Sequence, residues 1–173
     1  TFTNTGHTQS FSNIDRLVMN GGKGNDRLII GPNVTTAITF DGGEGDDYFE
    51  GGAGHDIVHG GTGNDTLLGN GGNNRLDGGD GADIITGGAG EDTLVGGTGD
   101  DVLNGGSGND TYQFGDAWGK DVFDGEQTGT GAFDFTNVTK DLTINITAGG
   151  AQGSSGNNFI AFQSPIPYIT DIK

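Results

Sequence analysis

The chain has 173 residues, 38 of them Gly and none of them Cys, and its net charge at pH 7 is −17. Without Cys, the chain can form no disulfide, thiolate metal site or thiol nucleophile. The 24 acidic residues face only seven scattered basic ones and no apolar run reaches membrane-spanning length, so we expect neither nucleic-acid binding nor direct membrane insertion.

Residues 1–20 are predicted to be an N-terminal lead-in. They open with TFTNTGHTQS, which has no Met and no signal-peptide pattern, so we expect the chain to be part of a longer protein. Met19 lies two residues before the Gly21 turn, where the apolar position of a repeat would fall. The segment RLVMN is therefore predicted to be a first strand.

A nine-residue repeat follows. One unit, GGKGNDRLI, covers Gly21–Ile29, and eight more run without a gap from Gly42 to Gln113. Numbering the unit from its first Gly, position 6 is Asp in eight of the nine units and position 8 is always apolar. A period of this length and regularity indicates an array of stacked structural units.

Each unit combines a turn with a strand. Half of its first six residues are Gly, which permits positive φ and tight turns, and its last three residues suit a short strand with position 8 facing inward. Two units then form one 18-residue coil. Stacked coils predict an all-β, right-handed parallel β-roll over residues 21–124. One inward apolar residue per unit is a thin core for so Gly-rich a chain, so we expect a ligand to stabilise it.

Calcium fits this pattern best. Ca²⁺ accepts six to eight oxygen ligands in loose geometry, whereas Mg²⁺ requires a strict octahedron and Zn²⁺ prefers His or Cys. Turns two units apart stack on one side of the roll, so an ion can lie between them. About seven ions are expected, which would offset most of the charge of −17. The predicted side-chain ligands are Asp26, Asp47, Asp56, Asp65, Asp83, Asp92, Asp101 and Asp110.

The stacking predicts which turns share an ion. On one side the pairs are Asp47 with Asp65, Asp65 with Asp83, and Asp83 with Asp101. On the other side they are Asp56 with Asn74, Asn74 with Asp92, and Asp92 with Asp110. The turn of Asp26 pairs with that of Asp47 if TTAITFD supplies an irregular strand between them.

The unit GNGGNNRLD departs from the pattern, with Asn70 at position 2 and Asn74 at position 6. An amide oxygen can bind Ca²⁺ but brings no charge, so Asn74 is predicted to be a weak ligand. The two ions that share its turn are expected to bind weakly or to be replaced by water. Alternatively, Asn74 only caps its turn and binds nothing.

A zinc site is the competing interpretation of GHDIVHGG, where His55 and His59 are four residues apart, as in the H-E-x-x-H motif of helical zinc proteases. That motif requires a helix, and the glycines around it disfavour one. In the repeat, both histidines fall at variable positions and are expected to face solvent.

The units resemble the RTX (repeats-in-toxin) nonapeptide, G-G-x-G-x-D-x-U-x, the calcium-binding repeat of hemolysin-type proteins. The resemblance implies bacterial export by type I secretion machinery, a secreted or cell-surface location, and folding on calcium outside the cell. It also implies that TYQFGDAWGKDVFDG closes the array, with Asp121 as a weak position-6 equivalent displaced by two residues. Carbonyl ligands would come from the first four positions of each turn; the candidates are Gly22, Gly24, Gly43, Gly45, Gly52, Gly54, Gly61, Gly63, Gly79, Gly81, Gly88, Gly90, Gly97, Gly99, Gly106 and Gly108.

Residues 125–173 lack the repeat. AFDFT, DLTINIT and NNFIAF alternate apolar and polar residues and are predicted strands, whereas TAGGAQGSSGNN is a predicted loop. We expect a β-rich extension that caps the roll, since solenoids need capped ends. A small separate β-domain is the alternative.

No catalytic constellation is present. The chain has no G-x-S-x-G elbow or phosphate-binding loop, and its carboxylates recur in equivalent turns rather than in the two distinct environments of a catalytic pair. We therefore predict a non-catalytic calcium-binding module or spacer of a larger secreted protein. The alternatives are a carbohydrate-binding module of an extracellular enzyme such as an alginate epimerase, with Tyr112, Phe114 and Trp118 as a sugar patch, and a hydrolase fragment.

Overall fold

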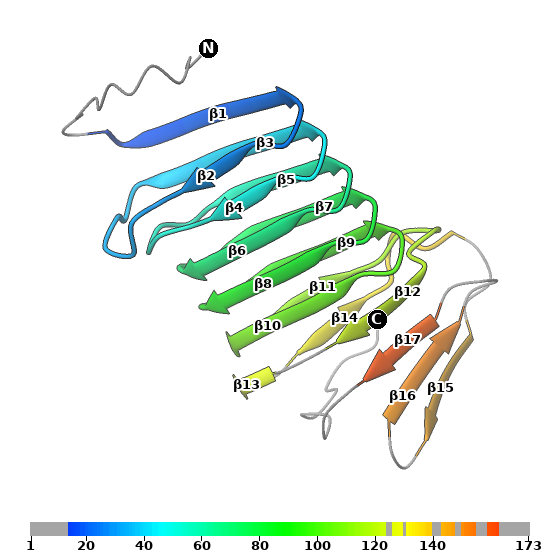
Figure 1. Cartoon of the computed structure of the whole chain (residues 1–173). Helices are drawn as coiled ribbons and strands as arrows, with labels where there is room; N and C mark the ends of the chain where they lie inside the picture. The colour runs from blue at the N-terminus through cyan, green and yellow to red at the C-terminus, as the bar shows by residue number, and fades with distance from the viewer. Residues whose placement is uncertain are drawn as a thin grey trace.

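The computed structural model describes residues 14–123, 126–129, 131–139, 143–147, 150–154 and 159–162. These ranges contain strands and no helix, so they contain no helix that could cross a membrane. The chain winds into a flattened coil whose strands run in one direction within each of two facing sheets (Figure 1). Residues 1–13, most of the predicted lead-in, lie outside the described part.

The odd-numbered strands form one sheet of seven strands, in the order β1-β3-β5-β7-β9-β11-β14. All neighbours in it are parallel. Its strands are β1 Arg16–Lys23, β3 Ala37–Glu44, β5 Ile57–Thr62, β7 Arg75–Asp80, β9 Thr93–Thr98, β11 Thr111–Gln113 and β14 Ala132–Asp134.

The second sheet has eight strands in the order β17-β12-β10-β8-β6-β4-β2, with β13 also paired to β10. Its strands are β2 Arg27–Ile29, β4 Tyr48–Glu50, β6 Thr66–Gly71, β8 Ile84–Ala89, β10 Val102–Gly108, β12 Lys120–Phe123, β13 Glu126–Gly129 and β17 Phe159–Phe162. A separate antiparallel pair joins β15 Thr143–Thr147 to β16 Gly150–Ser154.

The register confirms the nine-residue period. Val58 lies opposite Leu76, and Leu76 lies opposite Leu94, so one coil takes 18 residues. The first coil is longer, since Met19 lies opposite Phe40. At the other end Leu103 lies opposite Phe123, which confirms the two-residue shift predicted before Asp121.

The core is a single file of position-8 side chains between the two sheets. Phe49, Leu67, Leu76, Ile85 and Leu94 have 0 % exposure, and their strand neighbours at positions 7 and 9 face outward. At the C-terminal end the file widens into an aromatic cluster, in which Phe114 contacts Trp118 and stacks on Phe135 at 4.5 Å between ring centroids. The roll is therefore thin along its length and thickest where the repeats end.

Two predictions about local structure were wrong. The strands of the central coils have six residues rather than three, because they continue through the first three positions of the next unit. The predicted loop TAGGAQGSSGNN contains β16, whose backbone pairs with β15 from Ile144 opposite Gly153 to Thr147 opposite Gly150. Backbone pairing of this kind needs no large apolar side chain, so the sequence pattern gives no signal for it.

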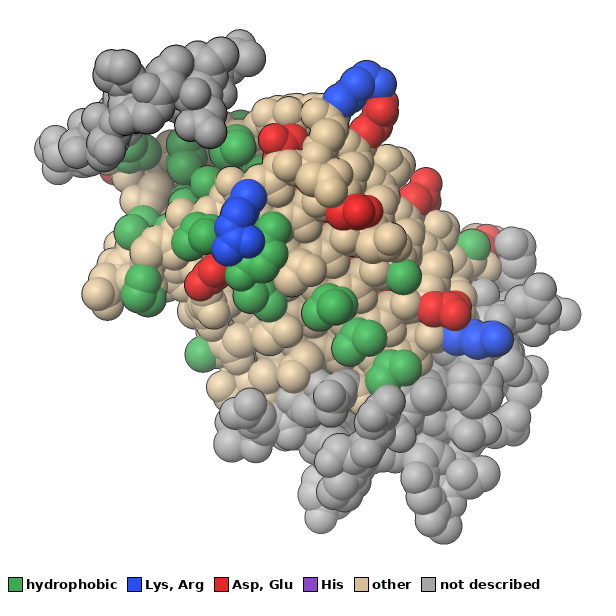
Figure 2. Space-filling view, viewed as in Figure 1, with side chains coloured by type: hydrophobic (Ala, Val, Ile, Leu, Met, Phe, Trp, Pro, Cys, Tyr) green, Lys and Arg blue, Asp and Glu red, His purple; other side chains and the backbone are tan. Residues whose placement is uncertain are grey.

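The other predicted elements are confirmed. RLVMN lies within β1, the irregular strand of TTAITFD is β3, and β14, β15 and β17 fall in the three alternating segments. Strands β14 and β17 extend the two sheets beyond the last repeat by pairing with β11 and β12. On the face shown in Figure 2, the acidic side chains are separated from one another. Many of the other carboxylates are buried inside the turns.

Candidate metal centres

The turns stack in two rows along the narrow edges of the roll. We call the row that follows the odd-numbered strands edge 1, with Asp26, Asp47, Asp65, Asp83, Asp101 and Asp121 at position 6. The row that follows the even-numbered strands is edge 2, with Asp56, Asn74, Asp92 and Asp110. The predicted same-side neighbours therefore stack, coil upon coil.

One carboxylate oxygen of each stacked turn holds the preceding coil. Asp65 Oδ1 accepts the backbone N–H of Asp47 at 2.7 Å, and Asp83 Oδ1 accepts that of Asp65 at 2.7 Å. The same bond recurs on edge 2, where Asp92 Oδ1 accepts the N–H of Asn74 at 2.7 Å. Each position-6 carboxylate thus lies in the gap between its own turn and the turn before it.

The other carboxylate oxygen is buried and has no hydrogen-bond partner. This holds for Oδ2 of Asp26, Asp47, Asp56, Asp65, Asp83, Asp92, Asp101 and Asp110. A buried charge without a partner is strongly destabilising, so each oxygen requires a proton or a cation. Burial accordingly raises the pKa of Asp83 to about 7, that of Asp92 and of Asp101 to about 6, and that of Asp121 to about 8.

Backbone carbonyls from the preceding turn line the same gaps. At position 2 of turn 78–83, a Cβ on Gly79 would lie 2.1 Å from the carbonyl oxygen of Gly61, and at position 4 one on Gly81 would lie 1.8 Å from that of Gly63. The backbone there has φ of 106° and 138°, which favours Gly. Position 1 is equally closed to larger residues, because a Cβ on Gly78 would lie 2.1 Å from Asp83 Oδ2.

The donors in each gap are therefore all oxygens. A gap offers the unpartnered carboxylate of one turn and the position-2 and position-4 carbonyls of the turn before it, a donor set that suits Ca²⁺ and not the N- and S-preferring metals. Within the described ranges, no three His, Cys, Asp or Glu side chains gather in one metal-binding cluster. A cation there would depend on backbone oxygens for most of its ligands.

Asn74 breaks the row on edge 2. Its Oδ1 accepts the N–H of Asp56 at 2.9 Å, so its Nδ2 must lie where the aspartates have Oδ2. Nδ2 donates to the carbonyl oxygens of Gly71 at 3.4 Å and Gly72 at 3.3 Å. In this arrangement the gap in front of Asn74 has a hydrogen-bonded amide nitrogen where the other gaps have an unpartnered oxygen. Asn70, at φ 66°, adds a bond from its Nδ2 to the Gly51 carbonyl at 2.8 Å.

Asp121 continues edge 1 beyond the repeats. Its Oδ1 accepts the N–H of Asp101 at 3.2 Å, and a Cβ on Gly119 would lie 1.7 Å from the Gly99 carbonyl oxygen, as at a position-4 glycine. The turn of Asp26 starts edge 1, and no described turn precedes it. Its Gly22 and Gly24 carbonyls face the next gap, and its carboxylate has a buried Oδ2 without a hydrogen-bond partner.

A second ladder at position 5 is absent from the sequence-based predictions. Asp46 Oδ1 accepts the N–H of Asn64 at 2.8 Å, and Asn64 Oδ1 accepts that of Ala82 at 2.8 Å. His55 belongs to it, because its Nδ1 accepts the N–H of Asn73 at 2.8 Å. His55 is exposed in its turn, as expected, and the hydrogen bond to the next turn adds to that expectation. The signal was available, since Asn, Asp or His fills position 5 in most units.

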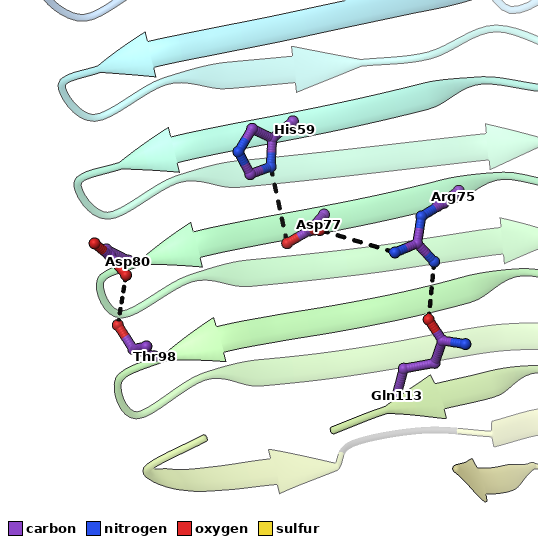
Figure 3. A network of polar contacts seen from close by, with 6 residues as sticks. All are labelled: His59, Arg75, Asp77, Asp80, Thr98 and Gln113. Carbon is purple, nitrogen blue, oxygen red and sulfur yellow. Dashed lines mark hydrogen bonds and ion pairs between the residues drawn. The ribbon is translucent and has the colours of Figure 1, made fainter. Parts of the chain in front are cut away.

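His59 lies on the outer face of β5 rather than on a helix, so the zinc interpretation is wrong. Its Nδ1 is 3.8 Å from Asp77 Oδ1 (Figure 3). Arg75 Nη2 is 3.9 Å from Asp77 Oδ2, and Arg75 Nη1 donates a hydrogen bond to Gln113 Oε1 at 2.9 Å. The first contact joins the neighbouring strands β5 and β7, the second lies within β7, and the third reaches from β7 past β9 to β11. All three lie on an exposed surface, where ion pairs contribute little to stability.

The aromatic residues at the end of the repeats do not form an exposed patch. Tyr112, Phe114 and Trp118 are 3 %, 2 % and 1 % exposed, and Tyr112 accepts the N–H of Gly105 at 2.8 Å through its hydroxyl. They pack the end of the core, so they offer no platform on which a sugar ring could stack.

Comparison with known proteins agrees with this geometry. The family model of the RTX calcium-binding nonapeptide repeat, in four copies, matches residues 39–67, 59–94 and 86–116, and the family comparison detects no catalytic family. No curated protein matches the chain. Repeats of this kind bind Ca²⁺, and the parallel roll with its stacked oxygen-lined turns is the architecture expected of them. The repeat region of this chain belongs to the RTX calcium-binding nonapeptide repeat family.

Proposed function

We propose that this chain is a calcium-dependent folding module of a larger secreted bacterial protein. The observation that carries the proposal is the double row of buried carboxylates, each with one oxygen that lacks a partner. Without a cation, neighbouring carboxylates of one edge repel each other, and Asp101 and Asp65 both raise the pKa of Asp83 in this way in addition to its burial. Ca²⁺ would supply the missing partner in each gap.

Seven gaps are cation sites in this proposal: six have the full donor set, and the gap in front of Asp121 has a buried carboxylate and a position-4 carbonyl. Five lie along edge 1 and receive their carboxylates from Asp47, Asp65, Asp83, Asp101 and Asp121. Two lie on edge 2 and receive theirs from Asp92 and Asp110. The total agrees with the seven predicted ions. Their distribution differs, because the gap in front of Asn74 is closed by an amide and the gap in front of Asp121 is added.

Folding would then be coupled to calcium concentration. The chain's own contribution to stability is one buried apolar side chain per unit and the hydrogen bonds between coils, so the free energy of calcium binding becomes free energy of folding. We propose that the module stays unfolded where calcium is scarce, passes through type I secretion machinery in that state, and folds outside the cell into a stiff spacer. Residues 21–124 would form the calcium-binding roll, and residues 125–173 its cap.

Calcium removal tests the proposal directly. In excess EGTA at neutral pH, we expect the far-ultraviolet circular dichroism of strands to disappear and the emission of Trp118 to move to longer wavelength, because this single Trp is 1 % exposed in the folded chain. Ca²⁺ should restore both signals, and an equal concentration of Mg²⁺ should not. A strand spectrum that survives complete calcium removal would contradict calcium-coupled folding.

The secretion role has a separate test. Limited proteolysis at submicromolar free Ca²⁺, as inside a cell, should degrade residues 21–124, whereas about 1 mM free Ca²⁺, in the range that extracellular modules use, should protect them. Equal protection at both concentrations would leave calcium binding intact but refute a role as an export-competent unfolded segment.

A further inference from the structure

One position-6 carboxylate faces a loop outside the repeats. Asp56 lies on edge 2, and the turn before it is the loop of residues 31–36, which connects β2 to β3 and has the sequence GPNVTT. Asp56 Oδ1 accepts the N–H of Ile38 at 2.9 Å, the bond that other aspartates make to the position-6 N–H of the preceding turn. The carboxylate of Asp56 therefore lies in the gap between this loop and turn 51–56.

The loop presents carbonyl oxygens as a repeat turn does. A Cβ on Gly52 would lie 2.5 Å from the carbonyl oxygen of Val34, and one on Gly54 would lie 2.5 Å from that of Thr36. In regular gaps these places belong to the position-2 and position-4 carbonyls. Val34 O also accepts the N–H of Ala53 at 2.7 Å, which leaves it one lone pair. The Thr36 hydroxyl donates to the Ile14 carbonyl at 3.0 Å and anchors this end of the loop to the lead-in.

The loop also changes the turn that stacks on it. The glycines at positions 2 and 4 of the other repeat turns have positive φ, and Gly52 and Gly54 do not. Asp56 nevertheless keeps the features of a ligand: it is 1 % exposed, and its Oδ2 has no hydrogen-bond partner. The buried oxygen therefore requires a proton or a cation here as much as it does in a regular gap.

The next gap on the same edge shows what a closed gap looks like. There Asn74 places an amide nitrogen in the oxygen's position and satisfies it with carbonyls of its own turn. Nothing comparable closes the gap in front of Asp56, in which no side-chain N–H reaches Oδ2. The two gaps share turn 51–56, and the position-6 side chain places an unpartnered oxygen in one and a hydrogen-bonded amide nitrogen in the other.

We propose that a Ca²⁺ ion binds between loop 31–36 and turn 51–56, held by Asp56 and by the carbonyl oxygens of Val34 and Thr36. This site rests on the calcium binding proposed above and adds an eighth ion, at a place where only one of the two turns belongs to a nonapeptide unit. The ion would link the loop to the first repeat turn of edge 2. The row of calcium sites on edge 2 would then begin one coil earlier than the repeat sequence indicates.

Anomalous diffraction locates the ion. Crystals of the full chain grown with Tb³⁺ in place of Ca²⁺ should show a peak bounded by Asp56 Oδ2, Val34 O and Thr36 O, and none in the gap in front of Asn74. The site is refuted if the gaps of Asp65 and Asp83 are filled while this one is empty. If all gaps are empty, the proposed function falls as well, so the two failures are distinguishable.

Counting bound calcium gives a second test in solution. Asp56→Asn should lower the saturating number of Ca²⁺ ions per chain by one, as measured by atomic emission after equilibrium dialysis. The chain already accepts Asn at this position in Asn74, so the variant is expected to fold. His55→Asn is the matched control: Asn fills position 5 in other units, and the count should stay unchanged. An unchanged count in Asp56→Asn would overturn the site.

Discussion

Gly79→Ala is the substitution for which the stacked turns make the sharpest prediction. A Cβ at this position would lie 2.1 Å from the Gly61 carbonyl oxygen, and real Cβ contacts below 3.0 Å essentially do not occur. Relief requires the two turns to separate by about 0.9 Å, which stretches the 2.7 Å bond between Asp65 N and Asp83 Oδ1 past the range of a hydrogen bond. The gap that would hold an ion opens by the same amount.

The magnitude follows from two costs. Alanine at φ 106° costs about 1–2 kcal/mol, and loss of a hydrogen bond to a charged group costs about 1.5–3 kcal/mol. Together they predict a loss of roughly 4 kcal/mol in the free energy of unfolding, on the order of a 1,000-fold change in the folding equilibrium. Since calcium binds only the folded chain, the calcium concentration at half-folding should rise in the same experiment.

Urea unfolding at saturating Ca²⁺, followed by Trp118 emission, measures the effect. Gly115→Ala is the control, because a Cβ at Gly115 meets nothing within 4 Å and its φ is not in the left-handed region. The control should unfold at the wild-type urea midpoint or slightly above it. If Gly79→Ala also keeps the wild-type midpoint, the turns are not as closely stacked as described, and the argument for a cation between them loses its geometric basis.

Three further predictions concern pH, the core and the interrupted edge. Burial raises the pKa of Asp83 to about 7 from its ordinary 3.8, so between these pH values the metal-free folded chain binds a proton that the unfolded chain does not, and its stability falls as pH rises. Circular dichroism in EGTA should therefore show more strand at pH 5 than at pH 8, and the opposite trend would refute a buried, protonated Asp83. Leu76→Ala, at a fully buried position, should lower the free energy of unfolding with Ca²⁺ bound by about 2–5 kcal/mol, and a urea titration that shows less than 1 kcal/mol would contradict a single-file core. Asn74→Asp should add one bound Ca²⁺ per chain in equilibrium dialysis, since it replaces the closing amide nitrogen by an oxygen; no added ion would show that something other than the amide closes this gap.

The periodic part of the fold was predictable because it depends on two side chains per unit. Position 8 fixes which face of the strand is buried, and position 6 fixes where carboxylates stack, so Leu76 and Asp83 could be placed from spacing alone. The two-residue shift that brings Asp121 into line with Asp101 was also visible in the sequence, since it changes only where the next Asp falls.

What could not be predicted depends on the backbone. The loop of residues 31–36 has no Gly-Gly or Asp signal, yet its Val34 and Thr36 carbonyls take the places of repeat carbonyls. Conversely, turn 51–56 has a perfect repeat sequence, and its glycines lack the positive φ of the other turns because they stack on that loop. A turn's conformation here follows from the turn beneath it, which no nine-residue window contains.

The aspartate at position 6 has two roles, a hydrogen bond to the preceding coil and contact with a cation, and Asn74 can perform only the first. One carboxylate oxygen accepts the N–H of the preceding coil, and an amide oxygen does this equally well, at 2.9 Å from Asp56 N. The other oxygen must face a cation, which an amide nitrogen cannot do. Asn at position 6 should therefore preserve the stacking of coils while removing an ion, whereas Ala should remove both. Comparing Asp→Asn with Asp→Ala at Asp65 thus divides the contribution of each turn into a hydrogen-bond part, which persists in EGTA, and a calcium part, which does not.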